Sequence, residues 1–300
     1  MGGFFLGCDI GGTGARFAVV DAAGNPVRRG TASGASALLA APGDRARLEA
    51  SFKRIGASLP HPHNAAMIGL SGYGPEAFDD IAALVMQAMG ITAGGLTLMD
   101  DIELAYCVLF APGEGHLVSA GTGAIGSHFR PDGSRLRVGG RGLMIDDAGS
   151  GGSIALAAVR ALYRRLDEDG DYGDMAGLAA QVFEMIGSDD WAEVKRLVYG
   201  GDRGRIGALS LAVARAADAG DPCAQGLLEE AGRELARLGN ILIFRAGDLP
   251  VAFVGGVLRL SPVVGETIAA HLDGRALFPE ADIAEGAAQL ARCAFQRQSE

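Results

Sequence analysis

The sequence predicts an α/β protein built from two similar halves, on three observations. The segment Gly12-Thr13-Gly14-Ala15 recurs at an offset of 109 residues as Gly121-Thr122-Gly123-Ala124. Each copy lies between two short apolar runs, which is the pattern of a tight turn joining two strands. Strand-like and helix-like segments then alternate along the chain. With 300 residues, of which 49% are hydrophobic, the chain is long enough for two packed domains.

The first half begins with a three-stranded meander. The apolar run Phe4 to Ile10 ends at two glycines and predicts a buried strand. Two more runs flank a turn at residues 22–26 and predict the second and third strands. Beyond the meander we expect helices over residues 44–59 and 75–89, and strands over residues 65–70 and 96–99.

The second half repeats this order with a long helical addition. The run Leu117 to Ala120 predicts a strand, and Pro131-Asp132-Gly133 predicts a hairpin turn between residues 127–130 and 135–138. Residues 150–246 have mostly helical spacing, with glycine and aspartate breaks. A strand over 251–254 and a closing helix over 283–296 complete the chain.

Composition argues against several functional classes. The chain has 26 Lys and Arg against 36 Asp and Glu, a net charge of −10, which disfavours nucleic acid as a partner. Neither lysine, Lys53 or Lys195, follows a glycine, so the chain lacks a Gly-x-x-x-x-Gly-Lys phosphate loop. The sequence has no recognisable signal peptide and no run of 18 apolar residues. We therefore expect a cytoplasmic protein with no membrane partner.

The four cysteines are far apart and contain no C-x-x-C pair. This spacing argues against a zinc site, an iron–sulfur site or a disulfide framework, and we expect all four side chains to be buried as small hydrophobic groups. They are Cys8, Cys107, Cys223 and Cys293.

The two glycine turns are candidate phosphate sites. Glycine lets backbone N–H groups approach anionic oxygens, and Thr13 and Thr122 add hydroxyl donors. Two ordinary tight turns are the alternative. Residues 121–126 also match the dinucleotide fingerprint G-x-G-x-x-G, but the strand and turn that follow replace the helix that the fingerprint requires.

Aspartates end two of the predicted strands in the first half. Asp9 directly precedes Gly11-Gly12, where a carboxylate could hold Mg²⁺ beside a phosphate. Asp100 and Asp101 end another strand, where a carboxylate could accept the proton of an attacking hydroxyl. Either could instead be the N-cap of the next helix, and one can be the cap while the other is the base.

With these segments in order, the chain resembles the actin-like sugar-kinase ATPase superfamily. More narrowly, it is similar to the bacterial N-acetylglucosamine/glucosamine kinases and to related ATPases that include 2-hydroxyacyl-CoA dehydratase activators. Motifs along nearly the whole chain carry the resemblance. They are a first phosphate motif at 9–16, a sugar-side loop at 69–72, the aspartates at 100–101, a second phosphate motif at 120–123, a glycine-rich stretch at 139–151 and an adenosine motif at 254–257.

The resemblance implies an α/β fold of two actin-like (ribonuclease H-like) lobes, made from a duplicated βββαβαβα unit with an ATP cleft between the lobes. The N-terminal lobe would span residues 1–112 and the C-terminal lobe residues 113–300. A helical insertion would occupy about 150–246, and the last helix, about 283–297, would pack back on the N-terminal lobe. A homodimer is also implied.

The implied activity is ATP-dependent transfer of a phosphoryl group to the 6-hydroxyl of N-acetylglucosamine or glucosamine. Asp101 would be the catalytic base and Asp9 would hold Mg²⁺. Substrate contacts would come from Ser71, Gly72, Asp101, Gly140 and Asp147. ATP contacts would come from Gly11, Gly12, Thr13, Arg16, Gly121, Thr122, Gly123, Gly255 and Gly256.

Three residues depart from the family pattern. Arg141 replaces a usual Trp, Ala148 replaces a Glu, and Ala37 falls where many relatives have a sugar-binding Asn. These changes leave the ATP assignment intact and bear on which sugar is bound. Arg141 and Ala148 also allow a non-catalytic sugar or nucleotide sensor, and the resemblance leaves two further alternatives, an ATPase that activates a partner and a sugar-responsive regulator. The acidic chain argues against the regulator, and the scattered cysteines argue against an iron–sulfur activator.

Overall fold

The computed structural model describes residues 3–38, 43–60, 63–200 and 203–298. The chain divides into two compact units. The first comprises Met1–Ala111 together with Glu280–Glu300, and the second comprises Pro112–Pro279. Each unit is built around one five-stranded sheet.

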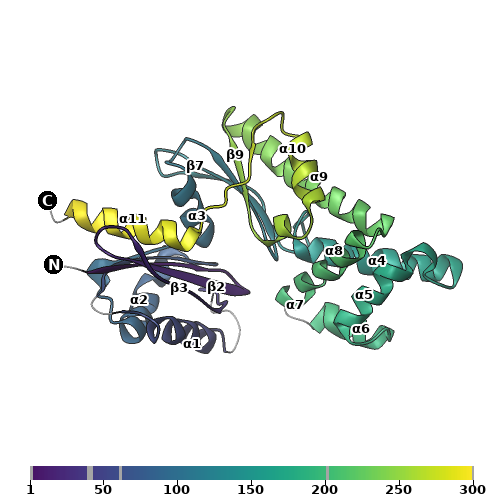
Figure 1. The fold of residues 1–300 in the computed structure, drawn as a ribbon, viewed down its shortest axis with the longest axis horizontal. Coiled ribbons are helices and arrows are strands. Elements are labelled where there is room, and N and C mark those ends of the chain that lie inside the picture. The colour runs from purple at the N-terminus through teal and green to yellow at the C-terminus, as the bar shows by residue number, and fades with distance from the viewer. Residues whose placement is uncertain (1–2, 39–42, 61–62, 201–202, 299–300) are drawn as a thin grey trace. The chain divides into compact units, whose positions relative to one another are not determined.

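The first unit's sheet has the strand order β3-β2-β1-β4-β5. Two of these strands, β2 and β3, are labelled in Figure 1. The first three strands form an antiparallel meander, and β4 and β5 add parallel to β1. Parallel neighbours require helical crossovers, which α1 and α2 supply. The strands are β1 (Phe4–Ile10), β2 (Gly14–Val20), β3 (Pro26–Ser33), β4 (His63–Leu70) and β5 (Leu96–Met99).

Helices cover both faces of this sheet. In Figure 1, α1 (Asp44–Gly56) and α2 (Phe78–Met89) lie on one side, and α11 (Ile283–Gln298) lies on the other. The helix α3 (Asp101–Leu109) packs beside α11. The turn Pro75–Ala77 is a separate 3₁₀ helix (η1), because its proline supports only the first helical turn.

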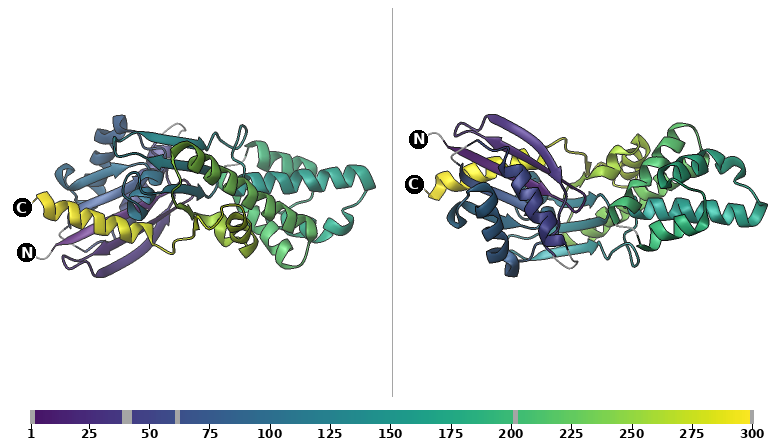
Figure 2. Two further views of the ribbon diagram at one scale, coloured as in Figure 1. Left: turned by 90° about the horizontal axis from the view of Figure 1, so that it is seen from above. Right: turned by 90° about the horizontal axis from the view of Figure 1, so that it is seen from below.

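The helix α11 returns the end of the chain to the first unit and lies along β1, β2 and β4 (Figure 2). Its alanines 287, 288 and 291 are buried against Phe5, and the ring of Phe295 contacts the Phe5 ring edge-on at 5.7 Å. A Cβ at Gly7 would lie 2.0 Å from the carbonyl oxygen of Ala284. Small residues on both elements therefore allow the closest approach of α11 to the sheet.

The second unit repeats the arrangement of the first. Its sheet order β10-β9-β6-β7-β8 matches β5-β4-β1-β2-β3 position by position, and the same pairs are parallel and antiparallel. The two Gly-Thr-Gly turns join equivalent strands, so the predicted duplication is confirmed. The strands are β6 (His116–Ala120), β7 (Ala124–Phe129), β8 (Arg135–Gly139), β9 (Val251–Val254) and β10 (Ala276–Leu277).

A helical insertion replaces the single helix α1 of the first unit. Helices α4 to α9 run between β8 and β9; five of them, all but α7, share one core with the second sheet, and Ile206 of α7 belongs to a smaller cluster with Ala155, Leu197 and Leu209. They are α4 (Gly151–Asp169), α5 (Ala176–Ile186), α6 (Trp191–Gly200), α7 (Arg203–Ala208), α8 (Ser210–Asp218) and α9 (Pro222–Ala246). Three 3₁₀ segments, η2 (Ala93–Gly95), η3 (Gly173–Met175) and η4 (Gly256–Arg259), lie in connections.

Two elements were not predicted from the sequence, and the prediction that all four cysteines are buried was correct only for Cys8. The helix α10 (Pro262–Ala270) and the two-residue strand β10 were not predicted. Cys8 is buried on β1, as expected, but Cys107, Cys223 and Cys293 are only half-buried on amphipathic helices. Within the described ranges, every helix is too short or too polar to cross a membrane.

Candidate active site

The first glycine hairpin joins β1 to β2 and leaves open space in front of its backbone. The N–H of Gly11 donates to the carbonyl of Gly14 at 3.0 Å, which closes the turn around Gly12 and Thr13. A Cβ at Gly12 or Gly14 would meet no atom within 4 Å. The hairpin therefore forms an uncovered backbone cradle that can admit an anion such as a phosphate.

Two further segments, at Gly34 and at Ser71, contact this hairpin and the end of β1. A Cβ at Gly34 would lie 2.3 Å from the nitrogen of Gly14, so only glycine allows this close contact. Ser71 donates its N–H to Ile10 at the end of β1 and accepts the N–H of Ala37, both at 2.9 Å. Within the described residues the Ser71 hydroxyl has no hydrogen-bond partner. Gly72 follows with a φ of 73°.

Strand register brings the predicted carboxylates to one edge of the first sheet. Asp9 pairs with Gly69 across β1 and β4, and Gly69 pairs with Met99 across β4 and β5. Asp100 and Asp101 directly follow Met99, so they leave the sheet beside Asp9. The carboxyl edge of parallel strands is where α/β proteins commonly place ligands.

The two adjacent aspartates have different environments. Asp100 is the N-cap of α3, and its side chain accepts the N–H of Ile102 at 3.2 Å. Asp101 begins the helix, and burial together with the negative charges of Asp100 and Asp9 raises its pKa to about 7. A carboxylate of this pKa exchanges protons near neutral pH, which suits a general base.

The Asp9 carboxylate lies in an environment that favours a nearby cation. Burial raises its pKa, Asp282 at the start of α11 raises it further, and Arg16 opposite it on β2 lowers it. A bound cation would relieve this crowding of negative charge, and Mg²⁺ prefers carboxylate oxygens. No group of three or more His, Cys, Asp or Glu in the described ranges could hold a metal alone. Phosphate and water oxygens would therefore complete the shell around Asp9.

The second glycine hairpin lies at the beginning of a long helix. Gly121 donates to Gly123 at 2.8 Å within the turn, and its own carbonyl accepts the N–H of Gly151, the first residue of α4, at 2.9 Å. A Cβ at Gly121 would meet no atom within 4 Å, so the space in front of this residue is open. The Thr122 side chain packs against α7, since a Cβ at Gly207 would lie 3.2 Å from its methyl group. A helix N-terminus beside an open glycine turn favours anion binding.

The glycine pair after β9 lies directly against the same hairpin. Gly255 has a φ of 113°, and a Cβ there would lie 2.2 Å from the carbonyl oxygen of Ala120. Gly256 begins η4, and the nearest atom to a Cβ there would be 3.8 Å away. The backbone at Gly255 therefore approaches the second hairpin as closely as it can, while Gly256 stays open.

Asp147 ties the glycine-rich loop to the second hairpin. Its Oδ1 accepts the N–H of Ala124 at 3.2 Å, and its Oδ2 faces Nη2 of Arg203 at 3.3 Å. The residue is 5% exposed, and burial raises its pKa although both partners act in the opposite direction. Gly140 lies in the same loop with a φ of 63°.

The predicted site residues therefore form two sets, one in each unit. The first set gathers around β1 and contains Asp9, Gly11, Gly12, Thr13, Arg16, Ser71, Gly72 and Asp101. The second gathers around β6 and contains Gly121, Thr122, Gly123, Gly140, Asp147, Gly255 and Gly256.

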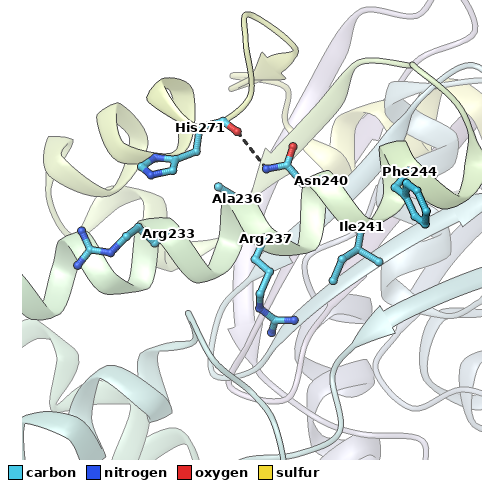
Figure 3. A pocket seen from close by; sticks show the side chains of 7 residues that line it. All are labelled: Arg233, Ala236, Arg237, Asn240, Ile241, Phe244 and His271. Carbon is cyan, nitrogen blue, oxygen red and sulfur yellow. Dashed lines mark hydrogen bonds between the residues drawn. The ribbon is translucent and has the colours of Figure 1, made fainter.

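Sequence reasoning missed two charged neighbours of these sets. Asp282 faces Asp9 from a segment more than 270 residues away, and Arg203 reaches Asp147 from α7. Neither belongs to a recognisable motif, so no local signal marks them. A separate hollow of about 390 Å³ lies along α9 (Figure 3), and its lining includes Arg237 but none of the predicted site residues.

Known proteins show the same fold and related sequences. A curated N-acetylmuramic acid/N-acetylglucosamine kinase of Clostridium acetobutylicum is 27% identical over 184 residues, which are 61% of this chain and 58% of that protein. This chain thus matches little more than half the length of that relative. A crystal structure of a candidate N-acetylglucosamine kinase from Chromobacterium violaceum is 27% identical, with a TM-score of 0.70, over 96% of this chain and 98% of that one.

A second crystal structure supports the fold alone. It is a candidate N-acetylglucosamine kinase from Porphyromonas gingivalis, 17% identical with a TM-score of 0.73, and it covers 96% of this chain and 99% of that one. The predicted actin-like fold is thereby confirmed. The family model of the BadF/BadG/BcrA/BcrD ATPases matches residues 6–291, so the chain belongs to the BadF/BadG/BcrA/BcrD ATPase family.

Proposed function

We propose that this protein is an ATP-dependent amino-sugar kinase that transfers the γ-phosphoryl group to the 6-hydroxyl of N-acetylglucosamine or glucosamine. The observation that carries the proposal is the pairing of two carboxylates at one sheet edge. Asp101, whose pKa is raised to about 7, lies beside Asp9 and next to an open glycine hairpin. Membership of an ATPase family supports ATP as the nucleotide.

In this proposal Asp101 takes the proton of the attacking hydroxyl. Its pKa of about 7 lets it be partly ionised at neutral pH and still basic enough to accept a proton. Asp100 keeps its place as the N-cap of α3 and holds the first turn of that helix. The base is therefore fixed at a helix N-terminus rather than on a loose loop.

The backbone N–H groups of each glycine hairpin would serve as phosphate donors. Gly11, Gly12 and Thr13 serve in the first unit, and Gly121, Thr122 and Gly123 serve in the second. Asp9 would hold Mg²⁺, which when bound neutralises phosphate charge. Arg16, opposite Asp9, adds a positive charge, and Gly255 and Gly256 leave room for the nucleoside.

Polar groups in each set are assigned as sugar contacts. The Ser71 hydroxyl and the Gly72 backbone serve from the first unit, and Gly140 and Asp147 serve from the second. The curated relative's name includes N-acetylglucosamine, which supports an amino sugar as the acceptor.

A second candidate is an ATPase of the same fold that either activates a partner or senses a ligand without phosphoryl transfer. The family description and the replacement of Trp by Arg141 and of Glu by Ala148 favour it. Cys107, Cys223 and Cys293 are half-buried and lie on three different helices, α3, α9 and α11.

A coupled assay of ADP release separates the two candidates. Mg-ATP is supplied with glucosamine, N-acetylglucosamine, N-acetylmannosamine, glucose or no sugar, and phosphorus NMR identifies the phosphorylated hydroxyl. Release that depends on one amino sugar supports the kinase, and release that ignores every sugar supports the ATPase. Sedimentation equilibrium tests the homodimer that we also propose.

A further inference from the structure

An apolar groove of about 510 Å³ lies on the helical insertion of the second unit. It follows one face of α5, from Ala176 through Ala180 to Glu184, because residues four apart on a helix share a face. Tyr172, which precedes η3, and Asp189, which precedes α6, also line it. None of these residues belongs to the two sets assigned to phosphate and sugar. This α5 groove has the size of a small-molecule site.

Aromatic rings form part of the lining of the α5 groove. Tyr172 and Phe183 both line it, and their ring centroids are 5.5 Å apart with an angle of 52° between the ring planes. Phe183 is buried and Tyr172 is half-buried, so Tyr172 is the more accessible of the two. The Phe183 ring also lies 6.4 Å from the ring of Tyr163, which fixes it from another side. Aromatic faces attract cations, because their π electrons carry partial negative charge.

Two carboxylates of the α5 groove lack a cationic partner. Glu184 and Asp189 are both exposed, and neither side chain forms an ion pair or a hydrogen bond within the described part of the chain. Burial raises the pKa of the Tyr172 phenol, and the negative charge of Asp189 raises it further, so this carboxylate lies close to the aromatic ring. The groove therefore combines an aromatic face with uncompensated negative charge.

The sequence around the α5 groove concentrates the negative charge of the chain. Residues 166–192 contain eight aspartates and glutamates and no lysine, arginine or histidine, so this stretch carries a charge of −8, against −10 for the whole chain. Arg165, just before the stretch, already pairs with Asp169 at 2.8 Å and with Asp174 at 3.1 Å. A hollow with charge of one sign raises the local concentration of the opposite ion and repels its own. This potential favours a cation in the groove and disfavours nucleotides and sugar phosphates.

We propose that the α5 groove binds a small alkylated ammonium ion, with the Tyr172 ring against the cation and with Glu184 and Asp189 balancing its charge. The alkyl groups on nitrogen contact the methyl groups of Ala176 and Ala180. A bare metal ion fits less well, because the described residues here offer no cluster of three His, Cys, Asp or Glu. This site goes beyond the proposed kinase function, since its ligand is neither the nucleotide nor the phosphoryl acceptor.

Isothermal titration calorimetry of the full chain with choline tests the proposal. The neutral control is 3,3-dimethylbutan-1-ol, which has the shape of choline with carbon in place of the quaternary nitrogen. We expect saturable binding of choline with a Kd of about 1 mM or below. The alcohol should bind about tenfold more weakly or not at all, because it lacks the charge that the ring and the carboxylates attract.

Single variants separate the groove from the general charge of the region. Tyr172→Leu should raise the Kd for choline about 2- to 30-fold, the range of a lost cation–π contact. Glu184→Gln and Asp189→Asn should each raise it about 2- to 5-fold, as expected for exposed charges. Ala180→Leu keeps a good helix former but fills the groove, and should abolish binding. Glu168→Gln is the matched control, because it removes a carboxylate of the same stretch that does not line the groove.

Several results would overturn the proposal. They are no saturable binding of choline, equal binding of the neutral alcohol, unchanged binding in Ala180→Leu, and a loss in Glu168→Gln as large as that in Glu184→Gln. A hexalysine peptide that binds where choline does not would show a surface for basic macromolecules instead. Thermal unfolding verifies that each variant folds. The titrations contain neither ATP nor sugar, so a failure of the kinase assay leaves their outcome unaffected.

Discussion

The backbone N–H of Ala124 donates to Oδ1 of Asp147 at 3.2 Å, and this bond joins the second glycine hairpin to a loop 23 residues farther along the chain. The Asp147 carboxylate is also close to Gly123, since a Cβ there would lie 3.1 Å from Oδ2. One buried side chain therefore holds the turn that we assign to phosphate and the loop that we assign to the sugar.

Asp147→Ala should lower the free energy of unfolding by about 1–3 kcal/mol, because it leaves the buried Ala124 N–H without an acceptor. Asp147→Asn retains an acceptor oxygen and should stay within about 1 kcal/mol of the natural protein. Urea unfolding of both variants measures the difference. Equal losses would mean that the charge, rather than the hydrogen bond, stabilises the hairpin.

Asp101→Asn should lower kcat by about 10²- to 10⁴-fold with little change in the fold, because it removes the proposed general base. Asp100→Asn preserves the N-cap, since asparagine is also a good N-cap, and should retain most of the turnover above pH 7 while lowering the pKa of Asp101, because it removes the neighbouring negative charge. Steady-state kinetics on both variants tests the assignment. A folded Asp101→Asn enzyme with normal kcat would show that another group accepts the proton.

The pH dependence of kcat/KM should contain an acidic limb with a midpoint near the Asp101 pKa of about 7. Protonation of Asp101 below this pH removes the base, so the rate should fall about tenfold per pH unit at lower pH. The profile is measured from pH 5 to 9 in the natural protein and in Asp101→Asn. A limb that persists in the variant belongs to a different group, such as the ATP phosphates.

The same carboxyl should destabilise the unliganded protein at alkaline pH. Since its pKa rises from 3.8 when unfolded to about 7 when folded, the native state binds more protons between these values, and stability falls as pH rises through this window. Asp101→Asn should therefore gain about 1–2 kcal/mol at pH 8. That is below the roughly 4 kcal/mol of the full shift, because the asparagine amide must also be buried and loses hydration.

Chemical denaturation at pH 5 and pH 8 compares the two proteins. The gain from Asp101→Asn should be smaller at pH 5, where the native carboxyl is protonated and most of the penalty is absent. A gain of equal size at both pH values would show that the variant stabilises the fold by some other route.

Gly255→Ala should lower the free energy of unfolding by more than about 2 kcal/mol and weaken ATP binding. The new Cβ would lie 2.2 Å from the Ala120 carbonyl oxygen, on a residue with a φ of 113°. Gly256→Ala is the control for stability, because the nearest atom to its Cβ would be 3.8 Å away. Thermal unfolding with and without ATP measures both effects, and equal stabilities would contradict the close approach.

Local pattern was sufficient to predict most of the fold. The repeated Gly-Thr-Gly turns, the apolar run at 4–10 and the helical spacing over 150–246 each correspond to observed elements. The strand β10 has only two residues, too few for any periodicity, so the sequence could not reveal it. Helix α10 follows a Ser-Pro start within a short segment that has little amphipathic contrast.

The candidate site was predictable only where it depends on local motifs. The glycine hairpins and strand-end aspartates carry such motifs, and the register of β1, β4 and β5 brings Asp9 and Asp101 to one edge. Arg203 lies 56 residues from Asp147 and carries no local signal. Its contact with Asp147 depends on the tertiary packing of α7, which sequence pattern does not describe.

The return of α11 to the first sheet affects how the chain can be made. During synthesis the strands β1 to β5 leave the ribosome first, but the helix that covers one face of their sheet leaves last. At typical elongation rates the intervening residues 112–279 take about 10–30 s to make. The first unit therefore cannot complete its folding until residues 280–298 have followed the whole of the second unit.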